Sequence, residues 1–297
     1  MLVNVQDVAS ERAVPPRAQA PPPTTAEVRR PPPPRQGVAA AISAELLAGL
    51  RAWPIWMVLG WDDIRQRYRR SVIGPFWITL SMGIFILLLG VIYSRLFHTD
   101  IRTYIPFLSA GLTVWAFIAQ NTNEGCLAFA EGARIIKQIK LPYSIYILRI
   151  VWRNLIIFMH TVAIFIPVAL IFRVPLSLAT LLVVPGLVLV CINVTWVALL
   201  LSILSTRFRD MQPIVATLVQ IAMFTTPIMW PVESLSDGRI IAEINPLYHL
   251  IDIVRAPMLG TAPEPLSWLV AGGVALLGWA LATAIMVAKH RRIVFWL

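Results

Sequence analysis

The densest group of charged and aromatic side chains lies between Trp53 and Ser71, where the chain reads WPIWMVLGWDDIRQRYRRS. Arginines at this density can hold the phosphates of anionic lipids through charge-assisted hydrogen bonds, and tryptophans favour the headgroup boundary of a bilayer. With Pro54 in its first turn, the stretch is typical of a helix lying on a membrane surface, and a helix packed on a partner subunit is the alternative. The apolar face of this helix would carry Trp53, Met57, Trp61, Ile64 and Tyr68.

A second basic stretch, from Glu131 to Pro142, is too polar for a membrane interior. The spacing predicts a short helix that ends before Pro142, with an apolar ridge and a basic border. Such a helix suits docking to a soluble partner, although a loop helix resting on its own bilayer remains open. The ridge would consist of Ile135, Ile136 and Ile139, and the border of Arg134, Lys137 and Lys140.

Residues 227 to 263 combine several prolines with apolar stretches such as Leu247 to Val254, which are too short to cross a bilayer. A re-entrant or interfacial hairpin is expected, since irregular backbone is tolerated at membrane depth where it lines protein or water. An external cap without a gating role is the alternative. Asp252 and Arg255, three residues apart, could pair on one helical face.

These stretches must be positioned by long apolar blocks. The block from Phe76 to Phe97 has no charged residue before Arg95 and covers roughly 30 Å as a helix, the hydrocarbon thickness of a bilayer. The composition agrees, because 58% of the residues are hydrophobic and only 13% are charged, against about 25% in soluble domains. We expect an all-α polytopic membrane protein with six transmembrane helices, at residues 76–97, 105–123, 150–172, 177–204, 211–230 and 267–288.

The predicted organisation has three parts: a disordered, proline-rich cytoplasmic tail at residues 1–40, an amphipathic interfacial helix region at 41–72 and a six-span domain at 73–297. Residues 1–37 hold nine prolines and no apolar run of the secretory-signal type. Of the 25 Lys and Arg residues, all but Arg95, Arg102, Arg173, Arg239 and Arg255 fall on the same side as the N-terminus. The positive-inside rule therefore predicts that both termini are cytoplasmic. The positive charge is then a topology and lipid signal, and nucleic-acid binding is not expected.

Polar residues within the apolar blocks are sparse, and no chain of buried carboxylates suggests a proton- or sodium-driven pump. Glu124 is expected near the interface and solvated. The two cysteines and four histidines show no metal-ligand spacing, so neither a metal nor a cofactor is expected in this chain. The chain also lacks a GxxxxGK[ST] phosphate loop, so ATP-driven transport would need a separate subunit.

Three local sequences resemble those of one protein family. They are LGWDDIRQRYRRS from Leu59, running into IGPFWITL from Ile73; IKLP from Ile139; and NPLY from Asn245, followed by Arg255 and by Leu259-Gly. From about residue 50 to 297, the chain resembles the permease subunits of bacterial ABC exporters for polysaccharides, including O-antigen, capsule and teichoic acid chains.

The resemblance implies a homodimeric channel in the bacterial inner membrane. Its partners would be two P-loop ATPase subunits, which bind ATP and Mg, and its cargo a lipid-linked glycan. In such permeases the helix before the first span lies near the site of substrate uptake, a short cytoplasmic helix couples to the ATPase, and hairpins before the last span close the outer mouth. Carried over to this chain, these roles fall to Trp53, Trp61, Arg65, Tyr68, Arg69 and Arg70 for uptake; to Arg134, Ile135, Ile136, Lys137, Ile139 and Lys140 for coupling; and to Trp230, Pro231, Asn245, Pro246, Tyr248, Asp252 and Arg255 for the outer gate.

Other functions remain open on these residues. An ABC permease for a small lipid or drug would share the ATPase partner. A membrane-embedded glycan-assembly enzyme is disfavoured, because no carboxylate pair sits in a large polar loop where sugar chemistry could occur. A scaffold without transport activity would not depend on an ATPase.

Overall fold

The computed structural model describes residues 38–69, 74, 76–236 and 238–297, so the tail predicted at 1–40 lies almost wholly outside the described residues. Contacts along the backbone divide the chain into Met1–Gln36 and a compact unit, Gly37–Leu297. In its described residues this unit contains twelve α-helices, two short 3-10 helices and no strand. The expected all-α class is therefore confirmed.

Five helical segments of the described chain are long and apolar enough to cross a membrane. They are α3 (Phe76–Leu96), α4 (Ile101–Gly125), the pair α6 (Ser144–Val162) and α7 (Phe165–Ile171), the pair η1 (Leu178–Leu182) and α8 (Val183–Arg207), and the first part of α12 (Pro265–Trp296).

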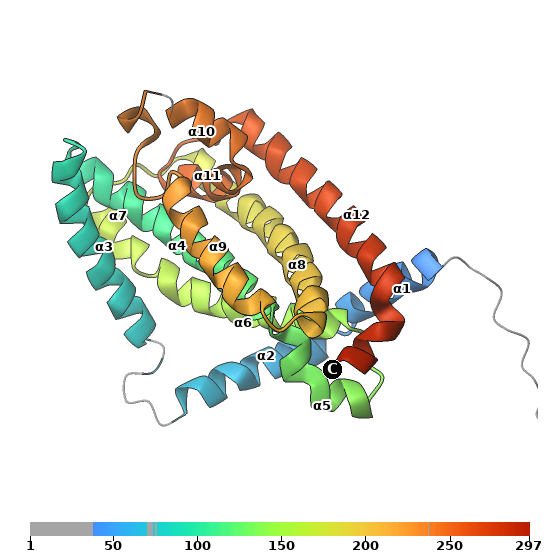
Figure 1. Cartoon of the computed structure of the whole chain (residues 1–297). Coiled ribbons are helices and arrows are strands. Elements are labelled where there is room, and N and C mark those ends of the chain that lie inside the picture. The colour runs from blue at the N-terminus through green and yellow to red at the C-terminus, as the bar shows by residue number, and fades with distance from the viewer. Residues whose placement is uncertain (1–37, 70–73, 75, 237) are drawn as a thin grey trace, which may run out of the picture. The chain divides into compact units, whose positions relative to one another are not determined.

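The sixth predicted span is shorter than expected. Helix α9 (Met211–Thr225) has 15 residues, or about 22 Å. It ends there because Thr226 precedes a proline, which disfavours helical backbone at residue 226, and Thr226 is extended. In Figure 1, α9 nevertheless returns from the end where α8 finishes toward α10 and α11. Whether it crosses the bilayer therefore stays a prediction.

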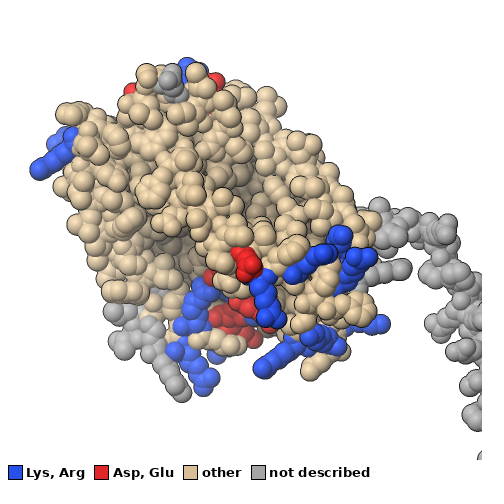
Figure 2. Space-filling model, viewed as in Figure 1, with Lys and Arg blue, Asp and Glu red and all other residues tan. Residues whose placement is uncertain are grey.

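The two ends of this unit differ in charge. Figure 2 shows Lys and Arg gathered at the end that carries α2 (Trp53–Tyr68), α5 (Ala128–Gln138) and the C-terminus of α12. We call this the basic end. Exposed residues there include Arg65, Arg69, Arg134, Lys137 and Arg209. The opposite end carries η2 (Val232–Ser234), α10 (Gly238–Ile244) and α11 (Pro246–Met258), which together occupy the segment predicted as a hairpin.

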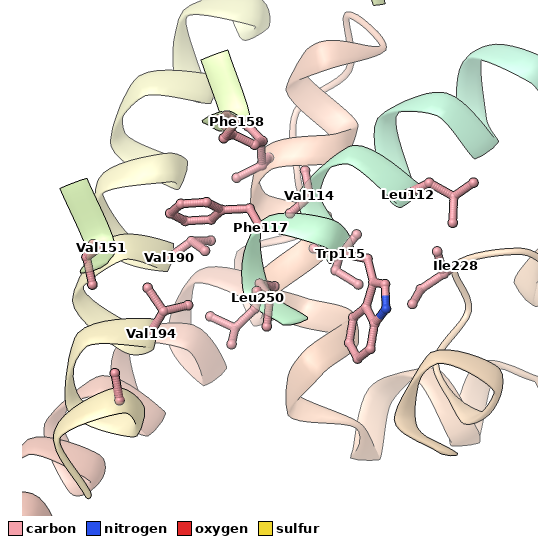
Figure 3. Packing of buried hydrophobic residues seen from close by; sticks show 14 of the residues in the cluster. Leu112, Val114, Trp115, Phe117, Val151, Phe158, Val190, Val194, Ile228 and Leu250 are labelled. Atoms are coloured by element: carbon pink, nitrogen blue, oxygen red, sulfur yellow. The ribbon is translucent and has the colours of Figure 1, made fainter. Parts of the chain in front are cut away.

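Helix α4 forms the centre of the core. In its membrane-spanning window 72% of the residues are buried, against 11% in the window of α3. Small residues in its middle, Ser109, Ala110 and Gly111, let neighbouring helices approach closely. Figure 3 shows Phe117 of α4 pointing toward Phe158 of α6, and their ring centroids are 5.2 Å apart. The central helix can thus fix α2, α6 and α8 at the basic end.

Two helices precede the first span. Helix α1 (Val38–Arg51) packs against α6 and α12, and α2 packs against α6. Helix α2 begins at Trp53, as predicted, with Pro54 in its first turn, and ends at Tyr68. Its location on a membrane surface stays a prediction.

Candidate functional site

Helix α2 is joined to the membrane helices by a cluster of five charged side chains, which we call the ionic cluster. Asp63 of α2 accepts hydrogen bonds from Arg149 Nε, at 2.6 Å, and from Arg153 Nη1, at 2.9 Å, and Arg149 Nη2 donates to its second oxygen. Glu124, near the end of α4, accepts from Arg153 Nη2 at 2.6 Å and from Arg67 Nη2 at 2.9 Å. Arg153 therefore bridges two acidic residues on different helices.

The ionic cluster is largely shielded from solvent. The side chains of Arg153, Asp63 and Glu124 are 6%, 12% and 20% exposed. The expectation that Glu124 is solvated is therefore wrong: its carboxylate is held by two arginines and also accepts from Gln120 Nε2 at 3.3 Å. Charges this buried are retained only when they are paired, so the ionic cluster makes the position of α2 depend on α4 and α6.

A close approach of α2 to α6 brings the ionic cluster together. Gly60 is buried, and a Cβ atom at this position would lie 2.9 Å from Trp152 and 3.0 Å from the Arg149 carbonyl oxygen. One turn earlier, Trp56 meets Trp152 edge to face, with ring centroids 6.0 Å apart. Ile64 is buried one turn later. A glycine flanked by apolar residues thus sets the distance at which Asp63 reaches the arginines.

The residues expected to take up substrate lie on other faces of α2. Trp53 and Trp61 are exposed large apolar residues, and Arg65 and Arg69 are exposed. Of the predicted apolar face only Ile64 is buried against protein. Tyr68 is partly buried, and this burial raises the pKa of its phenol. Arg70 lies outside the described residues. The tryptophans and arginines are thus free to meet lipid headgroups.

Helix α5 begins and ends earlier than predicted. It spans Ala128–Gln138, and Ile139 is already extended, so the expectation that Ile139 lies on its apolar face is wrong. The chain straightens here because two further residues lead to Pro142, which cannot continue a helix.

The two ends of α5 have different surroundings. Ala128, Phe129 and Gly132 are buried, with Phe129 packed on Tyr143 at a centroid distance of 5.4 Å. Ile135 and Ile136 are half-buried against the core, whereas Arg134, Lys137, Ile139 and Lys140 are exposed. The predicted apolar ridge is therefore divided, because two of its isoleucines hold the helix in place and only Ile139 is available to a partner.

At the opposite end, the first turn of α11 is held by Asn245. Asn245 Oδ1 accepts from the Leu247 amide at 2.9 Å as a helix cap, and its Nδ2 donates to Thr226 Oγ1 at 2.9 Å. Pro246 follows as the first residue of α11. The connection between α9 and η2 is held by Trp230, whose Nε1 donates to the Phe224 carbonyl at 3.1 Å, and Pro231 precedes η2.

Asp252 and Arg255 of α11 are both buried but do not form the predicted ion pair. Asp252 Oδ2 accepts from Ser267 Oγ at 2.9 Å, and Arg255 Nη1 donates to the Pro227 carbonyl at 2.7 Å. The Arg255 guanidinium lies over the rings of Phe107, at 4.5 Å, and Tyr248, at 5.6 Å. The prediction of a pair was wrong because each side chain finds a partner outside α11.

Residues 55–259 match the protein family described as ABC-2 type transporter. This match covers the ionic cluster, α5 and α11. The chain belongs to the ABC-2 type transporter membrane family.

Curated relatives of this ABC-2 membrane subunit carry more specific names. It is 25% identical over 191 residues to the O-antigen export system permease protein RfbA of Klebsiella pneumoniae, which covers 64% of this chain and 74% of that protein. It is 24% identical over 230 residues to the O-antigen export system permease protein RfbA of Myxococcus xanthus, covering 74% of this chain and 87% of that protein.

The ionic cluster of this ABC-2 membrane subunit was missed by sequence reasoning. Asp63 and its arginine partners are 86 and 90 residues apart, so no local pattern joins them. A signal was present nonetheless. Arg149 and Arg153 lie one turn apart at the start of an apolar block, and an arginine at such a position requires a partner.

Proposed function

We propose that this chain is the channel-forming permease subunit of an ATP-driven exporter. Its cargo is a lipid-linked polysaccharide, of the O-antigen or capsular kind, carried outward across the bacterial inner membrane. Membership of the ABC-2 family supports the transporter role, and the names of the relatives support the cargo. Both termini and the basic end face the cytoplasm in this proposal, in line with the gathering of Lys and Arg at that end (Figure 2).

The transporter is assembled from two copies of this chain and two P-loop ATPase subunits, on which ATP and Mg bind. The sequence supports separate ATPases because it has no phosphate loop of its own. Helix α3 supports a second copy: little of it is buried, and large apolar side chains such as Phe76, Trp77 and Phe85 are exposed along it. The channel for the polysaccharide runs between the two copies.

The observation that carries this proposal is the packing of α5 at the basic end. Its buried half packs on α6 and α8, while Arg134, Lys137, Ile139 and Lys140 remain exposed. An ATPase that pushes on the exposed half would move α6 and α8 directly, because Phe129 and Gly132 leave no compressible gap behind the helix. Helix α5 is thus the coupling helix.

Substrate uptake and release are assigned to the two ends of the unit. At the basic end the arginines of α2 offer bidentate donors to the phosphates of the lipid anchor. At the opposite end α10 and α11 close the outer mouth. The buried contacts of Asp252 and Arg255 hold α11 against Pro227 and Ser267 in the closed state.

The test is co-purification of the tagged chain from native membranes, with mass spectrometry of the proteins that remain bound. We expect a P-loop ATPase at equal stoichiometry, and we expect Ile139→Asp to release it. The matched control is Leu235→Asp at the opposite end, because Leu235 is 50% exposed and Ile139 is 55% exposed. Ile135 is unsuitable because it is half-buried and its substitution would also disturb α5.

Recovery of the chain without any ATPase in several mild detergents would contradict the proposal. So would equal ATPase retention by the wild type and Ile139→Asp. A deletion strain that keeps its surface polysaccharide but becomes sensitive to drugs would move the assignment to a small-molecule permease.

A further inference from the structure

A long apolar groove lies beside α6, and its described lining includes Trp56 and Trp152 but no residue of the ionic cluster or of α5. Its volume is about 760 Å³, and residues of α1, α2, α6, α8, α11 and α12 line it. None of the described residues that line it carries a charge. The groove follows a single face of α6 at spacings of three and four residues: Ser144, Leu148, Val151, Leu155, Phe158 and Val162.

The length of this groove restricts what can fill it. From Ser144 to Val162 the axis of α6 rises about 27 Å, close to the hydrocarbon thickness of a whole bilayer. An acyl chain of a phospholipid is matched to one leaflet, or about half of that thickness. One phospholipid tail would therefore fill only half of the groove. A single chain that fills it must be about twice as long.

The inner end of the groove is formed by α1 and α2 at the basic end, where Leu46, Leu50 and Trp56 line it. Arg51 directly follows Leu50 and is exposed. A phosphate attached to a chain in the groove would thus emerge at the basic end, where Lys and Arg gather (Figure 2). The outer end is formed by Val183 and Val184, at the start of α8, and by Met258 of α11. Charge and depth together describe a site for a lipid whose phosphate is cytoplasmic and whose chain runs the full depth.

We infer that this groove binds the polyprenyl chain of the lipid that anchors the cargo, with its phosphate at the basic end. The inference rests on the proposed function, which makes a lipid-linked glycan the substrate. It adds the place where the hydrocarbon is held while the sugar chain crosses the membrane elsewhere. A polyprenyl chain fits because it is long and carries no polar group along its length.

The experiment uses the full chain in nanodiscs with the subunits that co-purify with it. The probe is undecaprenyl phosphate with a photoreactive group near the far end of its chain. We expect cross-links to peptides of α6 and α8, and we expect unlabelled undecaprenyl phosphate to compete about tenfold better than farnesyl phosphate, whose chain reaches only part of the groove. Leu155→Trp and Val188→Trp narrow the groove and should each lower the cross-link yield several-fold. Leu276→Trp, on an exposed face of α12 outside the groove, should leave it unchanged.

Equal competition by a phospholipid of the same charge would overturn the inference, because acyl chains from each leaflet would then fill the groove end to end. Equal competition by farnesyl phosphate would also overturn it, because the length of the bound chain would then not matter. Cross-links confined to α3 and α9, or to a second copy of the chain, would overturn it as well. Polysaccharide export that persists at the wild-type level in Leu155→Trp would reject the groove but leave the proposed function standing. If no ATPase co-purified with the wild-type chain, the proposed function itself would fail instead.

Discussion

Arg153 and Glu124 are joined by a 2.6 Å hydrogen bond between α6 and α4, and Asp63 and Arg67 of α2 contact the same two side chains. The bond turns two separate inter-helix contacts into one network. One terminal nitrogen of Arg153 contacts Asp63 and the other contacts Glu124. Removal of Arg153 would therefore leave both shielded carboxylates with one positive partner fewer.

Replacing Arg153 by leucine is therefore expected to destabilise the protein strongly. Removing one partner of a buried ion pair typically costs about 3–5 kcal/mol, since the remaining charges stay desolvated. The measurement is the midpoint of thermal unfolding in detergent, followed by size-exclusion chromatography. Arg239→Leu is the control, because Arg239 is largely exposed and pairs with Glu243 only at the surface, where ion pairs contribute little to stability. Equal midpoints for the two variants would show that the ionic cluster contributes little.

Gly60→Ala is expected to separate α2 from α6. The added methyl group would lie about 3 Å from Trp152 and the Arg149 carbonyl, and overpacking of this kind costs about 1–3 kcal/mol. Gly272→Ala on α12 is the matched control, because a Cβ atom there meets no neighbouring atom within 4 Å and alanine favours a helix. Protease sensitivity at the Arg67–Tyr68 bond would report the release of α2. Stability of Gly60→Ala equal to or above that of Gly272→Ala would contradict this account of the close approach.

Helix α9 is the fifth of the six predicted spans, so its two ends are expected to lie on opposite sides of the membrane. Arg209, before α9, and Leu235, after it, are both exposed, so a cysteine at each position can be labelled with a membrane-impermeant reagent. In right-side-out cells we expect Leu235→Cys to react at once and Arg209→Cys to react only after permeabilisation. The native Cys126 and Cys191, which are buried and half-buried, are replaced beforehand. Reaction of both positions from the same side would reduce the spans to five.

Asn245→Ala is expected to loosen the first turn of α11. The substitution removes the cap, which contributes about 1 kcal/mol, and also the hydrogen bond to Thr226. Asn245→Asp is the control, since its carboxylate can still cap the Leu247 amide and can accept a hydrogen bond from the Thr226 hydroxyl. The measurement is amide hydrogen exchange across residues 246–258. We expect faster exchange in the alanine variant only, and identical exchange in both variants would contradict the role of the cap.

The sequence was sufficient to predict the elements that depend on local patterns. Helix α2 was expected from its aromatic and charged stretch together with Pro54, and all five long spans overlap apolar blocks that the sequence predicted as spans. The end of α5 was placed too late because the extended conformation reaches back from Pro142 to Ile139. Helix α1 was not distinguished, because its alanine-rich sequence carries no strong periodicity.

The contacts of the candidate site could not be predicted in the same way. The long-range partners of Asp63, Glu124 and Arg255 are set by how helices pack: Arg153 lies 90 residues from Asp63 and 29 from Glu124, and Pro227 lies 28 from Arg255. For Arg255 the nearest acidic residue in sequence, Asp252, was the obvious partner, yet a backbone carbonyl and two aromatic rings surround its guanidinium instead. Local spacing indicates which charges share a helix face but not which of them meet.

The long separation between Asp63 and its arginines also has a consequence for biogenesis. Helix α2 leaves the ribosome well before Arg149 and Arg153, which follow 86 and 90 residues later. During that interval α3, α4 and α5 are synthesised while the acidic side chain of α2 still lacks its partners. Helix α2 can therefore settle against α6 only after α6 has entered the membrane. Assembly of this end of the permease thus waits for its third long span, and a truncation before α6 would leave α2 undocked at the translocon.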